Sequence, residues 1–238
     1  ALAMLNQIRY IAGLDAGVTL NDTYTQMAQT GSMLNAANNQ LSHYPSRPSG
    51  MSDELYELGY SGTSSSNIAM TSWRSSLLKS LMMWMDDSDS SNIDRLGHRR
   101  WILNPTMQQT GFGYAVSNSG AAYSSVYVFD YDYHNTDVTG VAWPATEMPK
   151  RYFESSSAWS YSYGSSLKLQ CLTTGRERTW NFSSAASDGY FNVDNGGYGQ
   201  KGCVIFKPDS ISIQAGENYE VTITQDGTVI ADYTVHFF

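Results

Sequence analysis

The sequence predicts a mixed α+β domain followed by a small all-β domain. Three observations support this. The first hundred residues space their apolar side chains by three and four, the pattern changes to strand-like alternation after Pro105, and every segment beyond Trp159 has the pattern of a strand. Because the helices precede the strands and do not alternate with them, we expect an antiparallel sheet and no repeated βα units. The 238 residues suffice for one medium and one small domain.

Three helices and a shorter one are expected in the first half. Residues 2–12 place Leu2, Leu5 and Ile8 on one face, and a longer helix begins at Asn21 or Asp22. A short helix is expected after His43. The most strongly amphipathic helix is capped by Thr71 or Ser72 and ends in the acidic, serine-rich run 86–91; its apolar face consists of Leu77, Leu78, Leu81, Trp84 and Met85.

Strands follow Pro105. The segments 112–115 and 125–129 alternate in polarity around a turn at 118–120. Prolines and serines then interrupt both periodicities, so we expect a first domain over 1–142, a linker over 143–160 and an Ig-like β-sandwich over 161–238. At the C-terminus, residues 219–237 alternate on both sides of Asp226-Gly227, which predicts a hairpin with a type I′ turn.

Composition excludes several classes of partner. The formal net charge is -8 and the pI is about 4.8, so nucleic acid and anionic membranes are not expected as partners, since both require a basic face. No apolar run reaches the length of a transmembrane segment, and no signal-like segment opens the chain. The cysteines, Cys171 and Cys203, fit a disulfide and two buried thiols equally well.

The common enzyme signatures are missing. The sequence has no G-x-S-x-G elbow, no H-E-x-x-H, no phosphate loop and no complete dinucleotide-binding glycine motif. Asp87 to Ser91 has carboxylates spaced as in a calcium loop, but Asn92 stands at the glycine position and His98 at the terminal glutamate position. We therefore interpret this run as a solvated loop at a helix end.

Seven short blocks occur in an order that resembles a known family. They are Met4-Leu-Asn-Gln-Ile-Arg with Ala12-Gly-Leu, Ala28-Gln with Leu41-Ser-His43, Leu58-Gly-Tyr, Ser66-Asn-Ile-Ala, Trp84-Met, Gly97-His98-Arg-Arg-Trp-Ile-Leu-Asn-Pro and Gly111-Phe-Gly-Tyr-Ala. This order resembles bacterial proteins of the CAP superfamily, which comprises cysteine-rich secretory, antigen 5 and pathogenesis-related proteins. The resemblance covers about residues 1–135. It implies that the first domain is an α-β-α sandwich with a central antiparallel sheet.

The resemblance also implies a cleft lined by two histidines and two acidic residues. His43 and His98 match the histidines, Asp87 matches one acid, and Ser66 stands in place of the other. Asn67 follows Ser66 and is expected to fix a loop, and Glu54 could reach the cleft from the short helix. Two imidazoles and a carboxylate could hold a divalent metal, but with Ser66 in place of a carboxylate we expect weak binding by His43 and His98, or none. No cofactor is required.

Three functions remain open. The favoured one is a secreted, extracellular or cell-surface protein without enzymatic activity, which binds a small molecule, a lipid or a cell-envelope component in the cleft. The second is a peptidase-like hydrolase in which His43 or His98 acts as a base toward Ser66 or a water molecule. The third is an adhesive or structural surface module. Tyr127, Tyr131 and Tyr133 could stack on a sugar, but ordinary strand packing is favoured.

Overall fold

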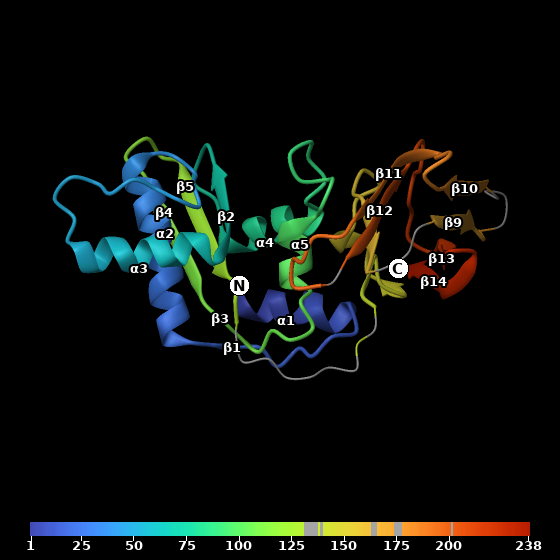
Figure 1. Ribbon diagram of the computed structural model, residues 1–238, viewed down its shortest axis with the longest axis horizontal. Coiled ribbons are helices and arrows are strands. Elements are labelled where there is room, and N and C mark those ends of the chain that lie inside the picture. Colours follow the sequence, from blue (N-terminus) through green and yellow to red (C-terminus); the bar gives the residue numbers. More distant parts are fainter. Residues whose placement is uncertain (131–137, 139, 163–165, 174–177, 201) are drawn as a thin grey trace. The chain divides into compact units, whose positions relative to one another are not determined.

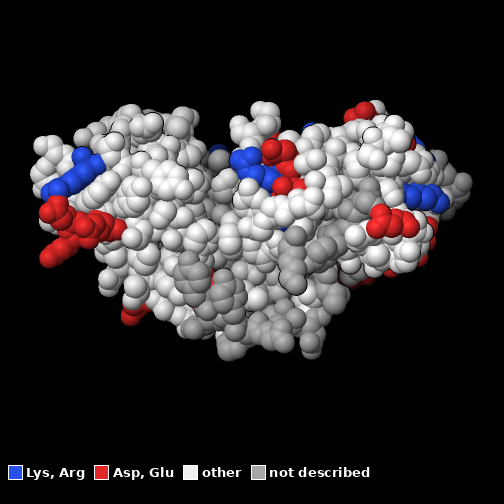
Figure 2. All heavy atoms as spheres, in the orientation of Figure 1, with Lys and Arg blue, Asp and Glu red and all other residues white. Residues whose placement is uncertain are grey.

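The computed structural model describes residues 1–130, 138, 140–162, 166–173, 178–200 and 202–238 (Figure 1). These residues form two compact units that interleave along the chain. The first unit comprises Ala1–Gln7, Asp15–Met85 and Thr106–Thr136, and the second comprises Ile8–Leu14, Asp86–Pro105 and Asp137–Phe238. Most of the face shown in Figure 2 carries no charge, in keeping with the 15% of charged residues in the sequence.

The first unit contains helices and a three-stranded antiparallel sheet of order β2-β5-β4. A separate pair of short strands, β1 and β3, is parallel. The elements of this unit, in chain order, are α1 (Leu2–Ile11), β1 (Thr19–Leu20), α2 (Asp22–Asn38), α3 (Asp53–Ser64), β2 (Ser66–Thr71), α4 (Leu77–Asp86), β3 (Gln109–Thr110), β4 (Phe112–Val116) and β5 (Ala122–Tyr127). The last residues of α1 and α4 belong to the second unit.

Helices α2 and α4 cover opposite faces of this sheet. Consecutive residues of a strand point to opposite faces of the sheet, and two neighbouring serines of β5 contact different helices. The Ser125 hydroxyl lies 2.9 Å from that of Ser32 on α2, whereas the Ser124 hydroxyl lies 2.7 Å from that of Ser80 on α4. The first unit is therefore layered helix, sheet, helix around a buried central strand.

Glycines bring α2 close to both of its neighbours. A Cβ atom at Gly62 of α3 would lie 1.9 Å from the Met27 carbonyl oxygen of α2, and one at Gly113 of β4 would lie 2.1 Å from the Ala28 carbonyl oxygen. Only residues without a side chain allow backbones to approach this closely. These contacts hold α3, whose end leads into β2, firmly against α2.

The second unit contains α5 (Gly97–Ile102), a short 3-10 helix η1 (Lys150–Tyr152) and two sheets. The sheet orders are β10-β9-β13-β14-β7 and β11-β12-β8-β6. Their strands are β6 (Ala142–Trp143), β7 (Glu147–Met148), β8 (Trp159–Tyr161), β9 (Ser166–Cys171), β10 (Arg178–Phe182), β11 (Gly189–Asp194), β12 (Cys203–Pro208), β13 (Asn218–Gln225) and β14 (Thr228–Phe237).

The two sheets share an aromatic core centred on Trp159, which is fully buried. The centroid of its ring lies 5.6 Å from the ring centroid of Phe206 in its own sheet. It lies 5.7 Å from that of Tyr219 and 5.9 Å from that of Phe237, both in the other sheet. Rings at these separations pack edge to face or tilted and supply much of the buried apolar area.

The segment 143–160 differs from the expected linker. It contributes β7, η1 and parts of β6 and β8, and its large side chains Trp143, Phe153 and Trp159 are at most 1% exposed. The strands of this segment are only two or three residues long, which is too short for an alternating pattern to be recognised in the sequence. The all-β part of the chain thus begins near Ala142.

Most expected helix ends agree with the structure, with one correction. Asn21 caps α2, its side chain accepting a hydrogen bond from the Tyr24 amide. Helix α4 begins later than expected, and Ser76 accepts from the Lys79 amide in place of the predicted cap at Thr71 or Ser72. The reason is that 66–71 forms β2, which pairs with β5. Leu78, expected on the apolar face, is 48% exposed.

The predicted C-terminal hairpin is confirmed. Strands β13 and β14 pair antiparallel, and Asp226 and Gly227 have φ of 50° and 79°, as a type I′ turn requires. Both cysteines are buried, free thiols, Cys171 on β9 and Cys203 on β12. Tyr127 stacks on Tyr24 with ring centroids 4.0 Å apart, whereas Tyr131 and Tyr133 lie outside the described residues.

Candidate functional site

His43 lies in the loop between α2 and α3 and is exposed. Its Nδ1 lies 2.7 Å from the carbonyl oxygen of Thr63 near the end of α3. The contact is reciprocal, because the buried Thr63 hydroxyl donates to the His43 carbonyl oxygen at 2.9 Å. A carbonyl oxygen can only accept, so Nδ1 carries the proton and donates it. When the ring is neutral, Nε2 is therefore the nitrogen that can accept a proton or bind a metal.

Ser66 and Asn67 begin strand β2, three and four residues after Thr63. Both are buried, 4% and 2% exposed. Asn67 lies in β2 and pairs with Val126, and its expected role in fixing a loop stays a prediction. The Ser66 hydroxyl has no hydrogen-bond partner among the described residues. Within the described part of the chain, Ser66 therefore forms no serine–histidine pair of the kind a serine hydrolase uses.

Asp87 follows directly after α4, in a left-handed backbone conformation with φ of 49°. It is 3% exposed. Its carboxylate accepts hydrogen bonds from the backbone amides of His98 at 2.9 Å and Arg99 at 3.3 Å, the first turn of α5. Leu96, which precedes the helix, supplies no side-chain cap. Asp87 therefore takes the place of the missing cap and puts its negative charge at the helix N-terminus.

The same carboxylate orients His98. Oδ1 of Asp87 lies 2.7 Å from Nδ1 of His98, whose side chain is 24% exposed. Two of the residues expected to line the cleft, Asp87 and His98, are thus in direct contact. An ionised carboxylate only accepts, so Nδ1 of His98 is the donor and Nε2 is the proton-accepting atom of the neutral ring. Histidines that bind metals or exchange protons are commonly oriented in this way by a second group.

The two arginines after His98 have structural roles. Arg99 is fully buried and donates to the carbonyl oxygens of Ala158 at 2.7 Å and Asp86 at 2.6 Å. Burial lowers the pKa of Arg99 to about 10, against the opposing effect of Asp87 and Asp86, so the guanidinium is charged at neutral pH. Arg100 is 1% exposed and pairs with Asp194 of β11. Together they fix α5, and with it His98, against the strands of the second unit.

The predicted site residues divide between the two units. Glu54 lies in the first turn of α3 and is exposed. His43, Ser66 and Asn67 belong to the first unit, and Asp87 and His98 to the second. A common cleft for the two histidines stays a prediction that rests on the family resemblance.

The described residues contain no group of three or more His, Cys, Asp or Glu side chains able to hold a metal ion. In the run that resembles a calcium loop, Asp89 accepts from the Ser91 amide and the Asn92 side chain, while Asp87 is occupied with α5. The residue that sequence reasoning missed is Thr63. It holds His43 through a backbone carbonyl, a group that every residue has and that leaves no trace in the sequence.

A family model and a solved structure each match part of the chain. The family model described as the cysteine-rich secretory protein family, CAP, matches residues 2–131. Among solved structures, an outer surface protein from Borrelia burgdorferi is similar, with a TM-score of 0.35 and 14% sequence identity over 52% of this chain and 85% of that chain. No curated protein matches the sequence. Within the described part of the chain, no helix is long and apolar enough to cross a membrane. More than half of the chain matches the family model, and the chain belongs to the cysteine-rich secretory protein (CAP) family.

Proposed function

We propose that this protein acts outside the cell, at or near the cell surface, and binds a small molecule, a lipid or a cell-envelope component at His43 and His98 without catalysing a reaction. The proposal rests on one observation, that both imidazole rings are anchored through Nδ1. Each histidine donates its Nδ1 proton to a buried partner, Thr63 or Asp87, and so directs its basic Nε2 away from that anchor. Rings held in this way are prepared for an external ligand.

The common cleft remains part of the proposal on the strength of the family order of motifs. The same order places a carboxylate where this chain has Ser66, so the proposed site carries one acid fewer than the family pattern. A ligand that hydrogen-bonds to imidazole therefore suits these residues better than a tightly bound metal does.

A hydrolytic function is less well supported. Such a function would require a nucleophile activated by a base within hydrogen-bond reach. The Ser66 hydroxyl has no such partner among the described residues. We therefore place both imidazoles in binding and neither in catalysis.

Two probes test the proposal, the disaccharide N,N′-diacetylchitobiose for glycans and a short-chain phosphatidylcholine for lipids. Each is titrated into the ¹⁵N-labelled protein. We expect saturable binding of one probe, weakened about tenfold or more in His43→Ala and in His98→Ala, as loss of a hydrogen bond to an oriented ring predicts. His236→Ala is the matched control. His236 also pairs through Nδ1, with Glu147 at 3.1 Å, but lies on the terminal hairpin. Binding that survives both cleft substitutions, or no binding of either probe, would contradict the proposal.

Zinc tests the weaker expectation of a metal. Neutral imidazole Nε2 is a common zinc ligand, but structural sites use four protein ligands. With two histidines and no second carboxylate, we expect Zn²⁺ to bind loosely or not at all by calorimetry. Tight binding that is lost in His43→Ala would show that these residues form a metal site.

A further inference from the structure

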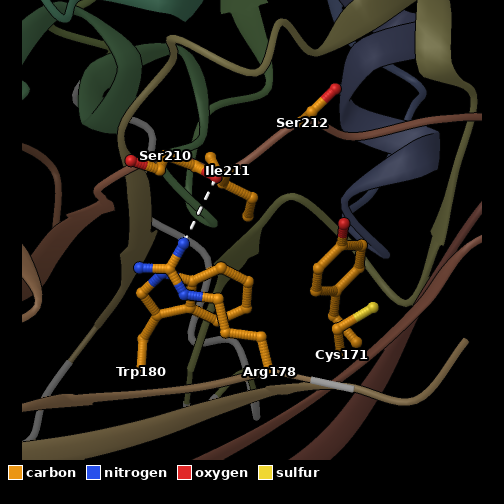
Figure 3. A pocket seen from close by; sticks show the side chains of 7 residues that line it. Cys171, Arg178, Trp180, Ser210, Ile211 and Ser212 are labelled. Carbon is orange, nitrogen blue, oxygen red and sulfur yellow. Dashed lines mark hydrogen bonds between the residues drawn. The ribbon is translucent and has the colours of Figure 1, made fainter. Parts of the chain in front are cut away.

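A cavity of about 290 Å³ lies in the second unit, and no residue of the proposed histidine site lines it (Figure 3). Its base is a row of paired residues that crosses three strands, with Arg178 on β10 opposite Cys171 on β9, which in turn is opposite Tyr219 on β13. Trp180 stands two residues beyond Arg178 and so on the same face. Residues 210–212, in the connection after β12, complete the lining.

The walls of this cavity are apolar and firmly held. Cys171, Trp180 and Tyr219 are each at most 3% exposed. The Trp180 indole donates to the Asp209 carbonyl oxygen at 3.0 Å, and the Tyr219 hydroxyl donates to Glu217 at 2.8 Å. The polar atoms of both rings are thus hydrogen-bonded within the protein, and the rings contribute apolar atoms to the cavity lining.

Arg178 is the charged member of the lining. Its guanidinium carbon lies 4.8 Å from the centroid of the Trp180 ring, which fixes the side chain over the indole. Figure 3 shows the guanidinium beneath the 210–212 segment, with one nitrogen directed toward Ser210. That contact, to the Ser210 carbonyl oxygen, is 3.5 Å long and therefore weak. Among the described residues, no carboxylate lies within ion-pair distance of Arg178.

We propose that this cavity binds a small organic carboxylate with a flat apolar body. The planar guanidinium of Arg178 presents paired donors that match a carboxylate, and the body would lie against Ile211, Tyr219 and the Trp180 indole. The volume is at the small end of the range for ligand pockets, which favours a compact acid over a long chain. Within the described residues Arg178 forms no ion pair, and its positive charge favours a negatively charged ligand.

Phenylacetate is the probe, and phenylacetamide, with the same shape and no charge, is the matched ligand. We expect phenylacetate at millimolar concentration to shift the assigned Trp180 indole resonance saturably in the NMR spectrum. Phenylacetamide should bind at least tenfold more weakly, and the affinity for phenylacetate should fall as salt is added. Arg178→Ala should lose tenfold or more in affinity, since it removes charged hydrogen bonds, and Arg178→Lys should lose less.

Arg151→Ala is the control variant. Arg151 also lies over an aromatic ring, Tyr152, at 5.0 Å, but does not line the cavity, so its replacement should leave binding unchanged. Arg178 and Arg151 are both exposed, and equal melting temperatures would show that the variants fold. Equal affinities for the acid and the amide, an equal loss in Arg151→Ala, or no saturable shift would overturn the proposal. None of these outcomes involves His43 or His98, so the two proposed sites are tested separately.

Discussion

The Asp87 carboxylate both caps α5 and orients the His98 ring. In Asp87→Asn the amide oxygen can still accept from the His98 backbone, while the amide nitrogen faces Nδ1 and can only donate. We expect the His98 ring to change tautomer, with the proton on Nε2, and the free energy of unfolding to fall by about 1–3 kcal/mol. Imidazole ¹⁵N NMR and urea denaturation measure the two effects.

Asp89→Asn is the control for this experiment. Asp89 lies two residues away in the same loop, is exposed and accepts hydrogen bonds from Ser91 and Asn92, so it acts on His98 only through its charge. It should leave the His98 tautomer as it is. A His98 ring protonated at Nδ1 in Asp87→Asn would show that the carboxylate does not determine the tautomer.

The thiols offer a second test at the residue scale. Cys171 and Cys203 are both free and 2% exposed, and burial raises the pKa of the Cys203 thiol to about 11, against the lowering effect of Arg100 and Arg99. Since the thiolate is the reactive form, a thiol reagent at pH 8 should label neither cysteine in the folded protein and both in urea. Absence of labelling in urea without reductant would instead reveal a disulfide.

At the scale of elements, the α2–α3 contact depends on glycine. In Gly62→Ala the new Cβ would lie 1.9 Å from the Met27 carbonyl oxygen, so the helices must separate. Overpacking against backbone should destabilise the protein by about 2–4 kcal/mol. Gly197→Ala is the control, because its Cβ would meet nothing within 4 Å. Urea denaturation of both variants measures the difference, and equal midpoints would contradict the packing described.

Which elements the sequence predicts depends on how they are buried. Helix α2 and the terminal hairpin were predictable because a cap or a turn marks their ends and one face is apolar. Strand β2 was missed because its first four residues are all buried and show no alternation. Helix α5 was missed because six residues are too few for a periodic pattern. Of the candidate site, the family resemblance singled out Asp87 and His98, which are in contact, whereas the backbone contact from Thr63 to His43 has no sequence signal.

For the molecule as a whole, the buried thiol and tyrosine hydroxyl groups should lower the free energy of unfolding at alkaline pH. Burial raises the pKa of Cys203 from an ordinary 9.0 to about 11 and also raises the pKa of Tyr161 and Tyr190, Asp94 adding to the effect on Tyr190. Because the folded pKa of each group exceeds the unfolded value, its stabilising contribution is complete below the unfolded pKa. The contribution is lost as pH rises through the folded pKa.

The free energy of unfolding should therefore fall between about pH 9 and pH 11, with Cys203 alone accounting for on the order of 2 kcal/mol. Urea denaturation at intervals across this range measures the decline. Cys203→Ala should flatten it, while Tyr10→Phe, which alters an exposed phenol, should not. A stability that stays constant to pH 11 would contradict the burial described here.

We propose that His43 and His98 act together as ligand-binding residues. The most direct test follows the Nε2 resonances of both rings by ¹⁵N NMR while the disaccharide and the phospholipid are titrated in turn. We predict that both rings are protonated at Nδ1 before ligand is added, and that with one probe both Nε2 resonances shift along a single binding curve while that of His236 does not. Rings protonated at Nε2 in the free protein, or resonances that neither probe moves, would contradict the account.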